Sequence, residues 1–531
     1  MPASSPTSLS HRFKAAILPL AALLWVSVGI GERGVAIHDE GHFLLAANTI
    51  VLGLKGVLGG VSLGALAESI HETGGTLFFA AKPGYVGLLA LGGIFSGSVS
   101  ASVALWINAL SFVGIVWLTY LVALRRFDWP WAARAVGIFC VASPLLAHSA
   151  RTALSTTPAL FFAMLALWLM HIERRPLLMG ALAGASAFFA FTCHYNILPL
   201  LLALLVAYWP SEPPRRRMAV IAGAAGCVIA IEGALLAADW LLRDAYPEFR
   251  SFFGELYANF TRSHVPGAAS ALERTDGVRG YGFKAYLYVG ILMAYGYHFL
   301  GVAALLGCLW AWKSKLWPGG TLRLIAAMIA VPLAFWLLYP WKVERCFVQL
   351  APGIALAGGW TFVRFGQLWI SSAQGERADA APPARVPIYW VLLGMAPAAG
   401  AIAVSVFASM PQPSRSPYAE TAAVNAEVIA RLPAGALTSA SFHRASAPLW
   451  KWYLGPGFEE VAGEGAVAPS DYRGFGAPLV IARDPLSASA PADPLFAAGE
   501  PQAYGERLGF MVSASDRGGT YSLWLRTGPL P

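Results

Sequence analysis

Charged side chains are scarce in this chain: Asp, Glu, Lys and Arg make up 12% of its 531 residues, about half the share usual in soluble domains. Hydrophobic residues make up 57%, and the mean hydropathy is +0.58. Together these numbers exclude a water-soluble globule, a disordered chain and a collagen-like or disulfide-stapled secreted protein. The composition therefore indicates a bundle of helices in a membrane.

The sequence also lacks a CxxC pair among its five cysteines, and it lacks a basic run interleaved with aromatic residues. All five cysteines lie in or at the edge of apolar stretches, where they are most simply small hydrophobic side chains. Residues 1–409 carry 28 Lys or Arg against 18 Asp or Glu. A positive excess in the apolar part points to membrane topology and anionic lipid, and not to nucleic acid.

A membrane-spanning helix needs about 20 mostly apolar residues, and we predict about eleven such helices. Their windows lie at roughly 14–31, 99–123, 131–148, 153–171, 177–194, 196–209, 219–242, 286–312, 322–339, 346–363 and 388–409. A shorter apolar piece at 85–97 is interpreted as interfacial or re-entrant. We find no internal repeat of the kind typical of inverted-repeat transporters.

The orientation follows from the basic residues of the short loops on one side of the membrane. These are Arg125, Arg126, Arg174, Arg175, Arg215, Arg216, Arg217, Lys313 and Lys315. The rule that positive loops stay inside places them, and the N-terminus, in the cytoplasm. Eleven crossings then put the loops at about 32–98 and 243–285, and the tail from 410, on the outer side of a bacterial inner membrane.

The tail differs in character from the rest of the chain. After a proline-rich linker, residues 419–432 have helical spacing, and short runs at 437–442, 479–482 and 521–525 are typical of strands. We therefore predict two domains: a polytopic α-helical membrane domain at 1–409 and a small α/β extracytoplasmic domain at 410–531.

Two adjacent carboxylates, Asp39 and Glu40, lie between His38 and His42 just outside the first predicted span. A carboxylate at the membrane edge can act as a general base toward an acceptor hydroxyl or amine. The plainer alternative is a solvated loop that caps the next helix, because Asp is a favoured N-cap. On a helix the two histidines would share a face and could hold a metal ion with a carboxylate, although the pattern is not HExxH.

Two groups of basic residues also lie on the predicted outer side. Lys82 stands immediately before the apolar piece, where it either snorkels to the headgroups or binds a lipid phosphate. Residues 339–345 place Lys342, Glu344 and Arg345 in a very short loop. Positive charge is disfavoured on the outer side of the membrane, so two cations in this loop indicate a functional role. Alternatively, Glu344 and Arg345 could neutralise each other.

Glu232 and Asp239 lie one heptad apart in the predicted span at 219–242. A carboxylate within a membrane costs about 2.5 to 3.5 kcal/mol on insertion scales, so it is expected to face a cavity or a partner. Proton coupling is one interpretation, and a structural bond to a neighbouring helix is the other.

In their order, four short motifs resemble the GT-C superfamily, the polytopic glycosyltransferases that take sugar from a polyprenyl phosphate. The similarity is to the branch of protein O-mannosyltransferases and lipid A aminoarabinose transferases, and it covers roughly residues 14–363. The motifs are Asp39-Glu40 after the first span, Lys82-Pro83 before the second, Ala150-Arg151 leading into the fourth, and Lys342 to Arg345 followed by Pro352 in the tenth.

The resemblance implies that Asp39 is the catalytic base, with Glu40 beside it. It also implies that Lys82 and Arg345, with Lys342 and Arg151, hold the donor phosphate. The family often has an acidic residue at the start of the fourth helix, where this chain has Leu-Ser-Thr-Thr-Pro at 154–158. The cofactor is left open, with a divalent metal ion as one option.

We predict an inverting glycosyltransferase that moves a hexosyl or pentosyl group from a polyprenyl-phosphate-linked sugar to a glycolipid, polysaccharide or protein acceptor. One alternative is a transporter or flippase of a lipid-linked sugar, with Glu232 and Asp239 as the proton relay. The other is a GT-C frame that has lost catalysis and serves as a binding or assembly subunit. An enzyme requires Asp39, whereas a transporter depends more on Glu232.

Overall fold

A computed structural model describes most of the membrane part and the strands of the tail. The described residues are 9–28, 30, 38–62, 82–127, 129–242, 251–257, 278–279, 281–297, 300–313, 317, 319–339, 341–373, 439–441, 458–460, 479–483, 505–512 and 520–526. The chain divides into two compact units. Unit one consists of Met1–Val28, Asn108–Ala230 and Gly277–Pro411, and unit two of Gly29–Ile107, Ile231–Asp276 and Gln412–Pro531. The predicted boundary at 409/410 lies outside the described residues.

Unit one is built from helices. It contains α1 (Leu9–Ser27), most of α5 (Ala101–Phe127), α6 (Pro130–Val141), α7 (Pro144–Ala150), α8 (Thr156–Met170), α9 (Pro176–Cys193), η2 (Tyr195–Ile197), α10 (Leu198–Tyr208), η3 (Trp209–Ser211), the first part of α11 (Pro214–Leu242), α13 (Phe283–Gly296), α14 (Leu300–Lys313), α15 (Gly319–Leu338), α16 (Glu344–Phe347), η4 (Val348–Leu350) and α17 (Ala351–Ala373). Two short strands, β1 (Val278–Arg279) and β2 (Trp341–Lys342), pair in antiparallel fashion.

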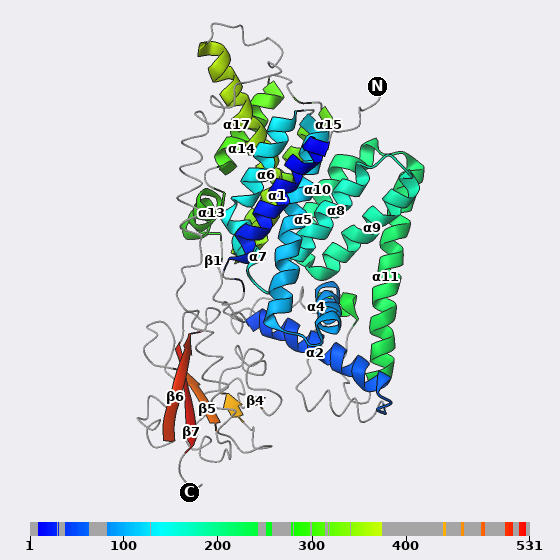
Figure 1. Ribbon diagram of the computed structural model, residues 1–531, viewed down its shortest axis with the longest axis vertical. Helices are drawn as coiled ribbons and strands as arrows, with labels where there is room; N and C mark the ends of the chain where they lie inside the picture. Colours follow the sequence, from blue (N-terminus) through cyan, green and yellow to red (C-terminus); the bar gives the residue numbers. More distant parts are fainter. Residues whose placement is uncertain are drawn as a thin grey trace. The chain divides into compact units, whose positions relative to one another are not determined.

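Close helix pairs form the interior of unit one. α8 packs on α9, α17 on both α6 and α14, and α10 on α15 (Figure 1). Some of these contacts need glycine: a Cβ atom at Gly359 of α17 would lie 2.7 Å from the backbone nitrogen of Val136 in α6. A bilayer offers little hydrophobic drive for helix association, so small residues that let backbones approach supply packing energy instead.

The described residues contain six helices that are long and apolar enough to cross a membrane, or seven if one bent pair is a single span. The six are at 40–58, 101–127, 176–193, 214–238, 320–338 and 344–364. The last five fall on predicted windows, whereas 40–58 lies in the predicted first outer loop. The predicted count of eleven is not reached among the described residues. The window at 388–409 lies outside them, and other windows form shorter apolar helices.

The predicted span at 131–148 is the bent pair. α6 and α7 are inclined by 57° to each other. The cause is Pro144, which lacks an N–H and disfavours helical backbone at the preceding residue; Ser143 accordingly has a ψ of 111°. The hydroxyl of Ser143 accepts a hydrogen bond from the N–H of Leu146 at 3.4 Å and so caps α7.

The predicted span at 286–312 is also interrupted. It forms two helices of 14 residues each, α13 and α14. α13 ends at Gly296, a residue type with weak helix propensity, and Tyr297 then leaves the helical region with φ −132° and ψ 15°. Each half is about 21 Å long at 1.5 Å per residue, which is shorter than the hydrocarbon core of a bilayer.

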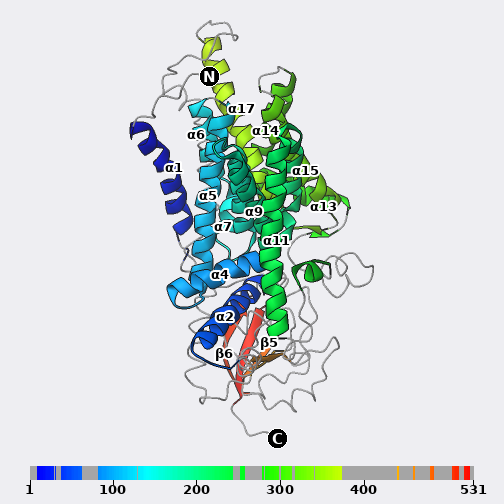
Figure 2. The same ribbon diagram turned by 90° about the vertical axis from the view of Figure 1, so that its right-hand side faces the viewer.

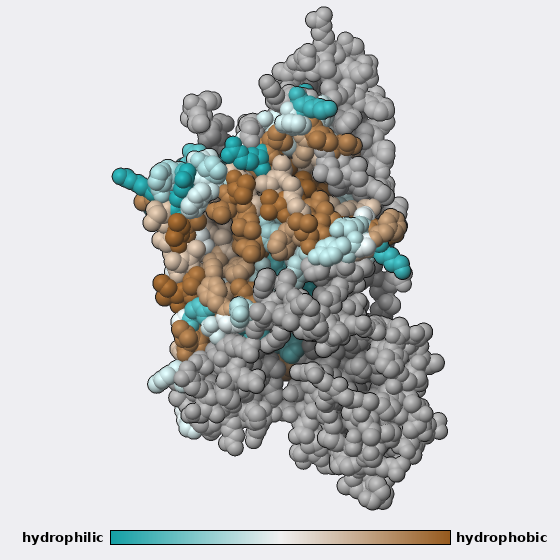
Figure 3. Space-filling model, turned by 180° about the vertical axis from the view of Figure 1, so that it is seen from behind, coloured by the Kyte–Doolittle hydropathy of each residue, from teal (hydrophilic) through white to brown (hydrophobic). Residues whose placement is uncertain are grey.

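Apolar side chains lie on the surface of the described helices as well as inside. On α9 and α10 the exposed large hydrophobic residues are Leu177, Leu178, Leu182, Leu198, Leu202, Leu205 and Val206. Figure 3 shows hydrophobic residues over most of the coloured part of one face, with hydrophilic residues toward its margins. This distribution is typical of helices that contact lipid, and the chain is a membrane protein.

A polar cluster joins the predicted cytoplasmic ends of α5, α8 and α10. His171, which follows α8, accepts a hydrogen bond from Arg126 at 2.9 Å and lies 2.7 Å from the hydroxyl of Tyr208. The pKa of His171 is lowered from 6.5 to about 3, mainly because burial disfavours the charged ring and secondly because Arg126 is close. The folded state thus favours the neutral ring. The contribution of the neutral His171 ring to the stability of the folded protein is fully present above pH 6.5, and it is lost as the pH falls from 6.5 toward 3.

Unit two contains α2 (His38–Leu58), α4 (Pro83–Ser96), the start of α5 and the end of α11. α2 and α4 pack on each other (Figure 2). α4 begins with Pro83, whose missing N–H is not needed in the first turn, and it ends at Gly97 with a φ of 87°. With 14 residues α4 is too short to span a bilayer. This length fits the prediction of an interfacial or re-entrant piece at 85–97.

The described part of the tail consists of five strands in one sheet. They are β3 (Ser439–Ser441), β4 (Phe458–Glu460), β5 (Leu479–Arg483), β6 (Gly505–Val512) and β7 (Thr520–Arg526). The order is β4-β3-β5-β7-β6, with β3 parallel to β4 and β5 and the remaining pairs antiparallel. β3, β5 and β7 fall on the three predicted runs. The predicted helix at 419–432 lies outside the described residues.

Candidate active site

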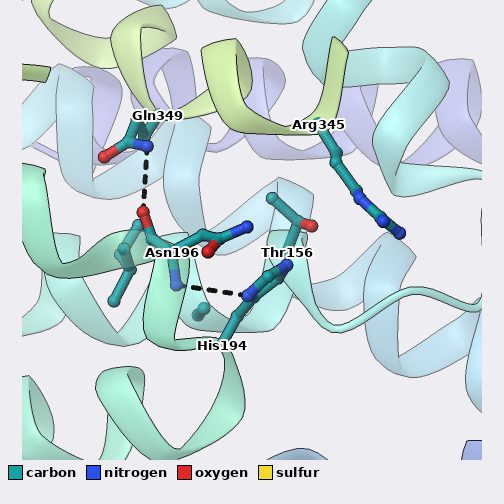
Figure 4. Close-up of a pocket in the computed structure, with 7 residues that line it drawn as sticks. Thr156, His194, Asn196, Arg345 and Gln349 are labelled. Carbon is teal, nitrogen blue, oxygen red and sulfur yellow. Dashed lines mark hydrogen bonds between the residues drawn. The ribbon is translucent and has the colours of Figure 1, made fainter. Parts of the chain in front are cut away.

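A small pocket lies in unit one, at the predicted outer ends of its helices. It has a volume of about 10 Å³ and is lined by Thr156, Ala159, His194, Asn196, Ile197, Arg345 and Gln349. The lining comes from the first turns of α8, the end of α9 with η2, and the segment α16–η4. Of the predicted phosphate-binding residues, Arg345 is the one that lines this pocket. In Figure 4 its side chain extends past Thr156, with the guanidinium end on the side away from Gln349.

Gln349 holds the walls of the pocket together. Its Oε1 accepts a hydrogen bond from the N–H of Leu200 at 3.2 Å, and its Nε2 donates to the carbonyls of Asn196 at 3.1 Å and Cys346 at 2.8 Å. Gln349 is buried, and these bonds use both N–H groups of its amide and one lone pair of Oε1. η2, α10 and the segment of α16 and η4 are thereby fixed relative to one another.

His194 closes the end of α9 and faces the same pocket. Its Nδ1 accepts a hydrogen bond from the N–H of Asn196 at 3.3 Å (Figure 4). An imidazole that accepts at Nδ1 and is neutral carries its proton on Nε2. His194 and Arg345 both line the pocket.

Two buried hydroxyls stand where α8 begins. Within the described residues, neither the Oγ of Ser155 nor the Oγ1 of Thr156 has a hydrogen-bond partner. Ser155 is the N-cap residue of α8, yet its side chain makes no capping bond. Thr156 is 6% exposed and lines the pocket, whereas Ser155 is 1% exposed and does not.

Arg151 is placed differently from Arg345. It ends α7, and its guanidinium donates to the carbonyl of Trp25 at 2.6 Å and stacks 4.9 Å from the centre of the Trp25 ring. Burial lowers the pKa of Arg151, because the charged form is poorly solvated there. The contacts attach α1 to the α7–α8 connection.

Lys342 is fully buried in a cage of carbonyls and aromatic rings. Its ammonium donates to the carbonyls of Leu337 at 3.1 Å and of Tyr339, and it lies 4.8 Å and 5.6 Å from the ring centres of Tyr281 and Tyr286. A cation at the C-terminal end of α15 also suits the helix dipole. Burial lowers the pKa of Lys342. Its charge is thus directed to the end of α15.

Unit two carries the predicted catalytic loop. Glu40 in the first turn of α2 is fully buried. Lys82, the N-cap of α4, is 7% exposed, and its ammonium lies 4.7 Å from the ring centre of Phe43, which meets Tyr85 edge-on at 5.3 Å. The structure therefore brings Lys82 onto the turn that follows Asp39 and Glu40. His38 and Asp39 belong to α2, but their side chains lie outside the described part.

Glu232 in α11 has a specific partner in unit two. Its carboxylate accepts hydrogen bonds from the backbone N–H groups of Phe253 at 2.9 Å and Phe252 at 3.3 Å, at the start of the short helix at 252–257. A carboxylate at a helix N-terminus is stabilised by these otherwise unpaired donors. Such a bond accounts for an intramembrane carboxylate without proton coupling. The side chain of Asp239 lies outside the described residues.

Within the described residues, no group of three or more His, Cys, Asp or Glu side chains is arranged to hold a metal ion. Among the described side chains at the start of α2, Glu40 and His42 are the candidate ligands.

Sequence reasoning missed the polar pocket residues Thr156, His194, Asn196 and Gln349. A usable signal was present, because each is a polar residue at the end of, or inside, a predicted apolar span. Polar residues in such places are rare and face the protein interior. Periodicity alone does not show which of them meet.

Comparison with known proteins gives no match by sequence: no family model and no curated protein matches the chain. Solved structures do match. ArnT from Cupriavidus metallidurans in the apo state gives a TM-score of 0.60 at 12% identity, over 97% of this chain and 98% of ArnT. ArnT bound to undecaprenyl phosphate gives 0.59 at 14% identity, over 97% and 99%.

A second kind of match is the oligosaccharyltransferase AglB from Archaeoglobus fulgidus, in complex with an inhibitory peptide and a dolichol-phosphate. It gives a TM-score of 0.54 at 11% identity, over 97% of this chain and 74% of AglB. ArnT, a lipid A aminoarabinose transferase, and AglB are both GT-C superfamily members. At such low identity the likeness establishes the fold: this chain has the GT-C fold. The resemblance seen in the sequence motifs is confirmed at that level.

Proposed function

We propose that this chain is a membrane glycosyltransferase that moves a sugar from a polyprenyl-phosphate donor to a glycolipid, polysaccharide or protein acceptor. The observation that carries the proposal is the fold, which is shared over 97% of the chain with an ArnT structure bound to undecaprenyl phosphate. A lipid donor suits this fold, because its tail can stay in the bilayer while its head reaches residues at the membrane surface.

In this proposal the reaction is a direct, inverting displacement. Asp39 deprotonates the acceptor, with Glu40 next to it in α2, and the acceptor oxygen or nitrogen attacks the sugar carbon opposite the phosphate. The bond between that carbon and the phosphate oxygen breaks. Lys82 and Arg345 stabilise the negative charge that develops on the departing phosphate.

Arg151 and Lys342 play a supporting part in the proposal. Their cations are already directed to the carbonyl and ring of Trp25 and to the end of α15. The loop that carries Lys342 also carries Arg345, so fixing the lysine fixes the position of the arginine three residues later. We therefore assign both residues to positioning.

The proposal further places the chain in a bacterial inner membrane, with a cytoplasmic N-terminus and a periplasmic tail. Residues 1–409 form the glycosyltransferase domain, and residues 410–531 form an accessory α/β domain that shapes access of the acceptor. The arginine bias of the short loops and the five-stranded sheet of the tail support this arrangement.

The transporter alternative receives no comparable support. It relies on Glu232 as a proton carrier, and the two backbone N–H groups that Glu232 binds give this carboxylate a structural task.

The experiment that tests the proposal is mass spectrometry of envelope glycolipids and glycoproteins from cells with and without the protein. We expect one sugar modification to disappear and to return with the wild-type gene, but not with the Asp39→Asn variant. Accumulation of an intact lipid-linked sugar on one leaflet, with Asp39→Asn fully active, would instead favour the flippase.

A further inference from the structure

The long helix α11 gives a scale for depth in the membrane. Its apolar span runs from Pro214 to Ala238 and is almost wholly exposed on the protein surface. Three arginines at 215–217 occupy its first turn, and cations at a span end stay at the headgroups. Residues 218–238 measure about 32 Å at 1.5 Å per residue, which matches the hydrocarbon core of about 30 Å. The hydrocarbon therefore ends near Ala238.

Trp240 agrees with this boundary. It lies two residues beyond Ala238 and is 78% exposed. Tryptophan gathers at the interface between hydrocarbon and headgroups, so an exposed Trp240 is expected at this height.

Glu232 lies inside the hydrocarbon by this scale. It precedes Ala238 by six residues, which is about 9 Å along the helix axis. The Cα–Cβ bond of a helical residue tilts toward the helix N-terminus, here away from the boundary near Ala238. The N–H groups of Phe252 and Phe253 that bind the carboxylate of Glu232 are thus brought to about the same depth.

The chain must turn back to reach this depth. Leu242, the last residue of α11, lies about 15 Å beyond Glu232 along the axis. The chain therefore leaves the hydrocarbon at the end of α11 and has returned to the level of Glu232 at residue 252.

The backbone of the short helix at 252–257 is paired as lipid requires. Its first two N–H groups bind Glu232. The N–H of Gly254 donates to the Oγ of Ser251 at 3.1 Å, and that of Glu255 to the carbonyl of Ser251 at 2.9 Å. In water the first N–H groups of a helix can bind solvent, whereas hydrocarbon offers no partner and demands internal pairing. All four donors of this first turn meet that demand.

The side chains of the segment continue the lipid-facing surface of α11. Phe253 is 45% exposed and Tyr257 more so, while Phe252 is buried. Leu236, one turn beyond Glu232 on α11, is also exposed. Exposed large apolar side chains at the depth of a span are expected to contact acyl chains.

We infer that residues 251–257 form a re-entrant piece of the second outer loop, inserted into the outer leaflet, with Glu232 as its anchor. The partner of the surface formed by Leu236 and Phe253 is the acyl chains of that leaflet. The inference does not depend on sugar transfer, because it follows from depth, backbone pairing and exposure.

The test measures depth by electron paramagnetic resonance of a nitroxide on a single introduced cysteine. Cys227 and Cys308, which are partly exposed, are first changed to alanine, since the other three native cysteines are buried. Full-length protein is reconstituted into vesicles of phosphatidylethanolamine and phosphatidylglycerol. Oxygen concentrates in the apolar core, whereas a nickel chelate present on both sides stays in water, so the ratio of the two collision rates rises with depth.

The nitroxide is placed at Phe253 and at two reference positions. Leu182 is exposed and lies six residues into the span at 176–193, so it matches the depth of Glu232 from the opposite boundary. Arg174 is exposed in the short loop before α9. We expect the ratio at Phe253 to equal that at Leu182 and to exceed that at Arg174.

Two variants test the anchor. Glu232→Ala removes both acceptor oxygens and should shift the ratio at Phe253 to the value found at Arg174. Glu232→Gln keeps one acceptor oxygen and should give a ratio between the two references. The ratio at Leu182 should stay the same in both variants, which controls for loss of the fold.

A ratio at Phe253 equal to that at Arg174, with Glu232 present, would overturn the insertion. Low collision rates with both reagents would also overturn it, since they would indicate that protein, such as a second copy of the chain, covers the segment. An unchanged ratio at Phe253 in both variants would overturn Glu232 as the anchor.

Discussion

The crossing of α9 and α11 allows a sharp test of the packing. A Cβ atom at Gly223 of α11 would lie 1.8 Å from the carbonyl oxygen of Ala181 in α9, and one at Gly184 of α9 would lie 1.9 Å from the carbonyl oxygen of Val220. At Gly226, three residues further along α11, a Cβ atom would meet nothing within 4 Å. We therefore predict that Gly223→Ala destabilises the protein and that Gly226→Ala does not.

The size of the effect follows from the distances. To bring the new contact at Gly223 to 3.0 Å, the two backbones must separate by about 1.2 Å, and overpacking of this kind typically costs about 1–3 kcal/mol. Exchange of Gly for Ala inside a helix gains about 1 kcal/mol of propensity. Because both variants make this exchange in one helix, the gain cancels when they are compared. Gly223→Ala should thus be less stable than Gly226→Ala by about 1–3 kcal/mol.

The assay is the thermal midpoint of the purified protein in detergent, followed by intrinsic tryptophan fluorescence. The double variant Gly184→Ala with Gly223→Ala provides an internal check. Both substitutions demand the same separation of the helices, so their combined cost should be less than the sum of the single costs. Equal midpoints for Gly223→Ala and Gly226→Ala would refute the close crossing.

Asp39→Asn should reduce sugar transfer by a factor of about 100 to 10,000 in a purified assay, with little change in the thermal midpoint, because Asn has the size of Asp and loses only the attraction of the charge for the N-terminal end of α2, about 0.3–1 kcal/mol; near-normal transfer would remove Asp39 as the base. Glu232→Gln keeps an oxygen for one backbone N–H and should transfer sugar at close to the wild-type rate, whereas loss of all activity would favour the proton relay. Between pH 7.5 and pH 5 the wild type should lose up to about 2 kcal/mol of stability through His171; His171→Gln should flatten this dependence, and an identical pH profile in the variant would contradict the assignment. A reporter fused after Pro531 should be active in the periplasm, and cytoplasmic activity would change the number of spans.

The sequence predicts the long spans well because uniform apolar composition over about 20 residues suffices to identify a helix in a membrane. The windows at 99–123 and 219–242 correspond to α5 and α11 in this way. Composition does not reveal interruptions that depend on single residues. Pro144 and Gly296 lie inside apolar windows and break them, because their backbone preferences act locally while a hydropathy average spans the whole window.

The candidate site shows a different limit. Lys342 and Arg345 are two cations in one short loop, and the sequence gives no reason to separate them. Their environments come from remote residues: the rings of Tyr281, just before α13, and Tyr286 of α13 face the lysine, whereas the arginine lines the pocket at α8 and η2. Such pairings depend on tertiary packing, and they cannot be predicted from the spacing of residues along the chain.

The three hydrogen bonds of Gln349 also restrict motion. Because one side chain ties η2, α10 and the end of α16 together, none of these segments can shift alone without breaking a buried bond. The opening of the pocket is then left to the half-buried side chain of Arg345. A rotamer change of one side chain is faster than a collective movement of helices, which takes microseconds to milliseconds. A slow phase in turnover would accordingly have to originate in the chemical step or in another part of the protein.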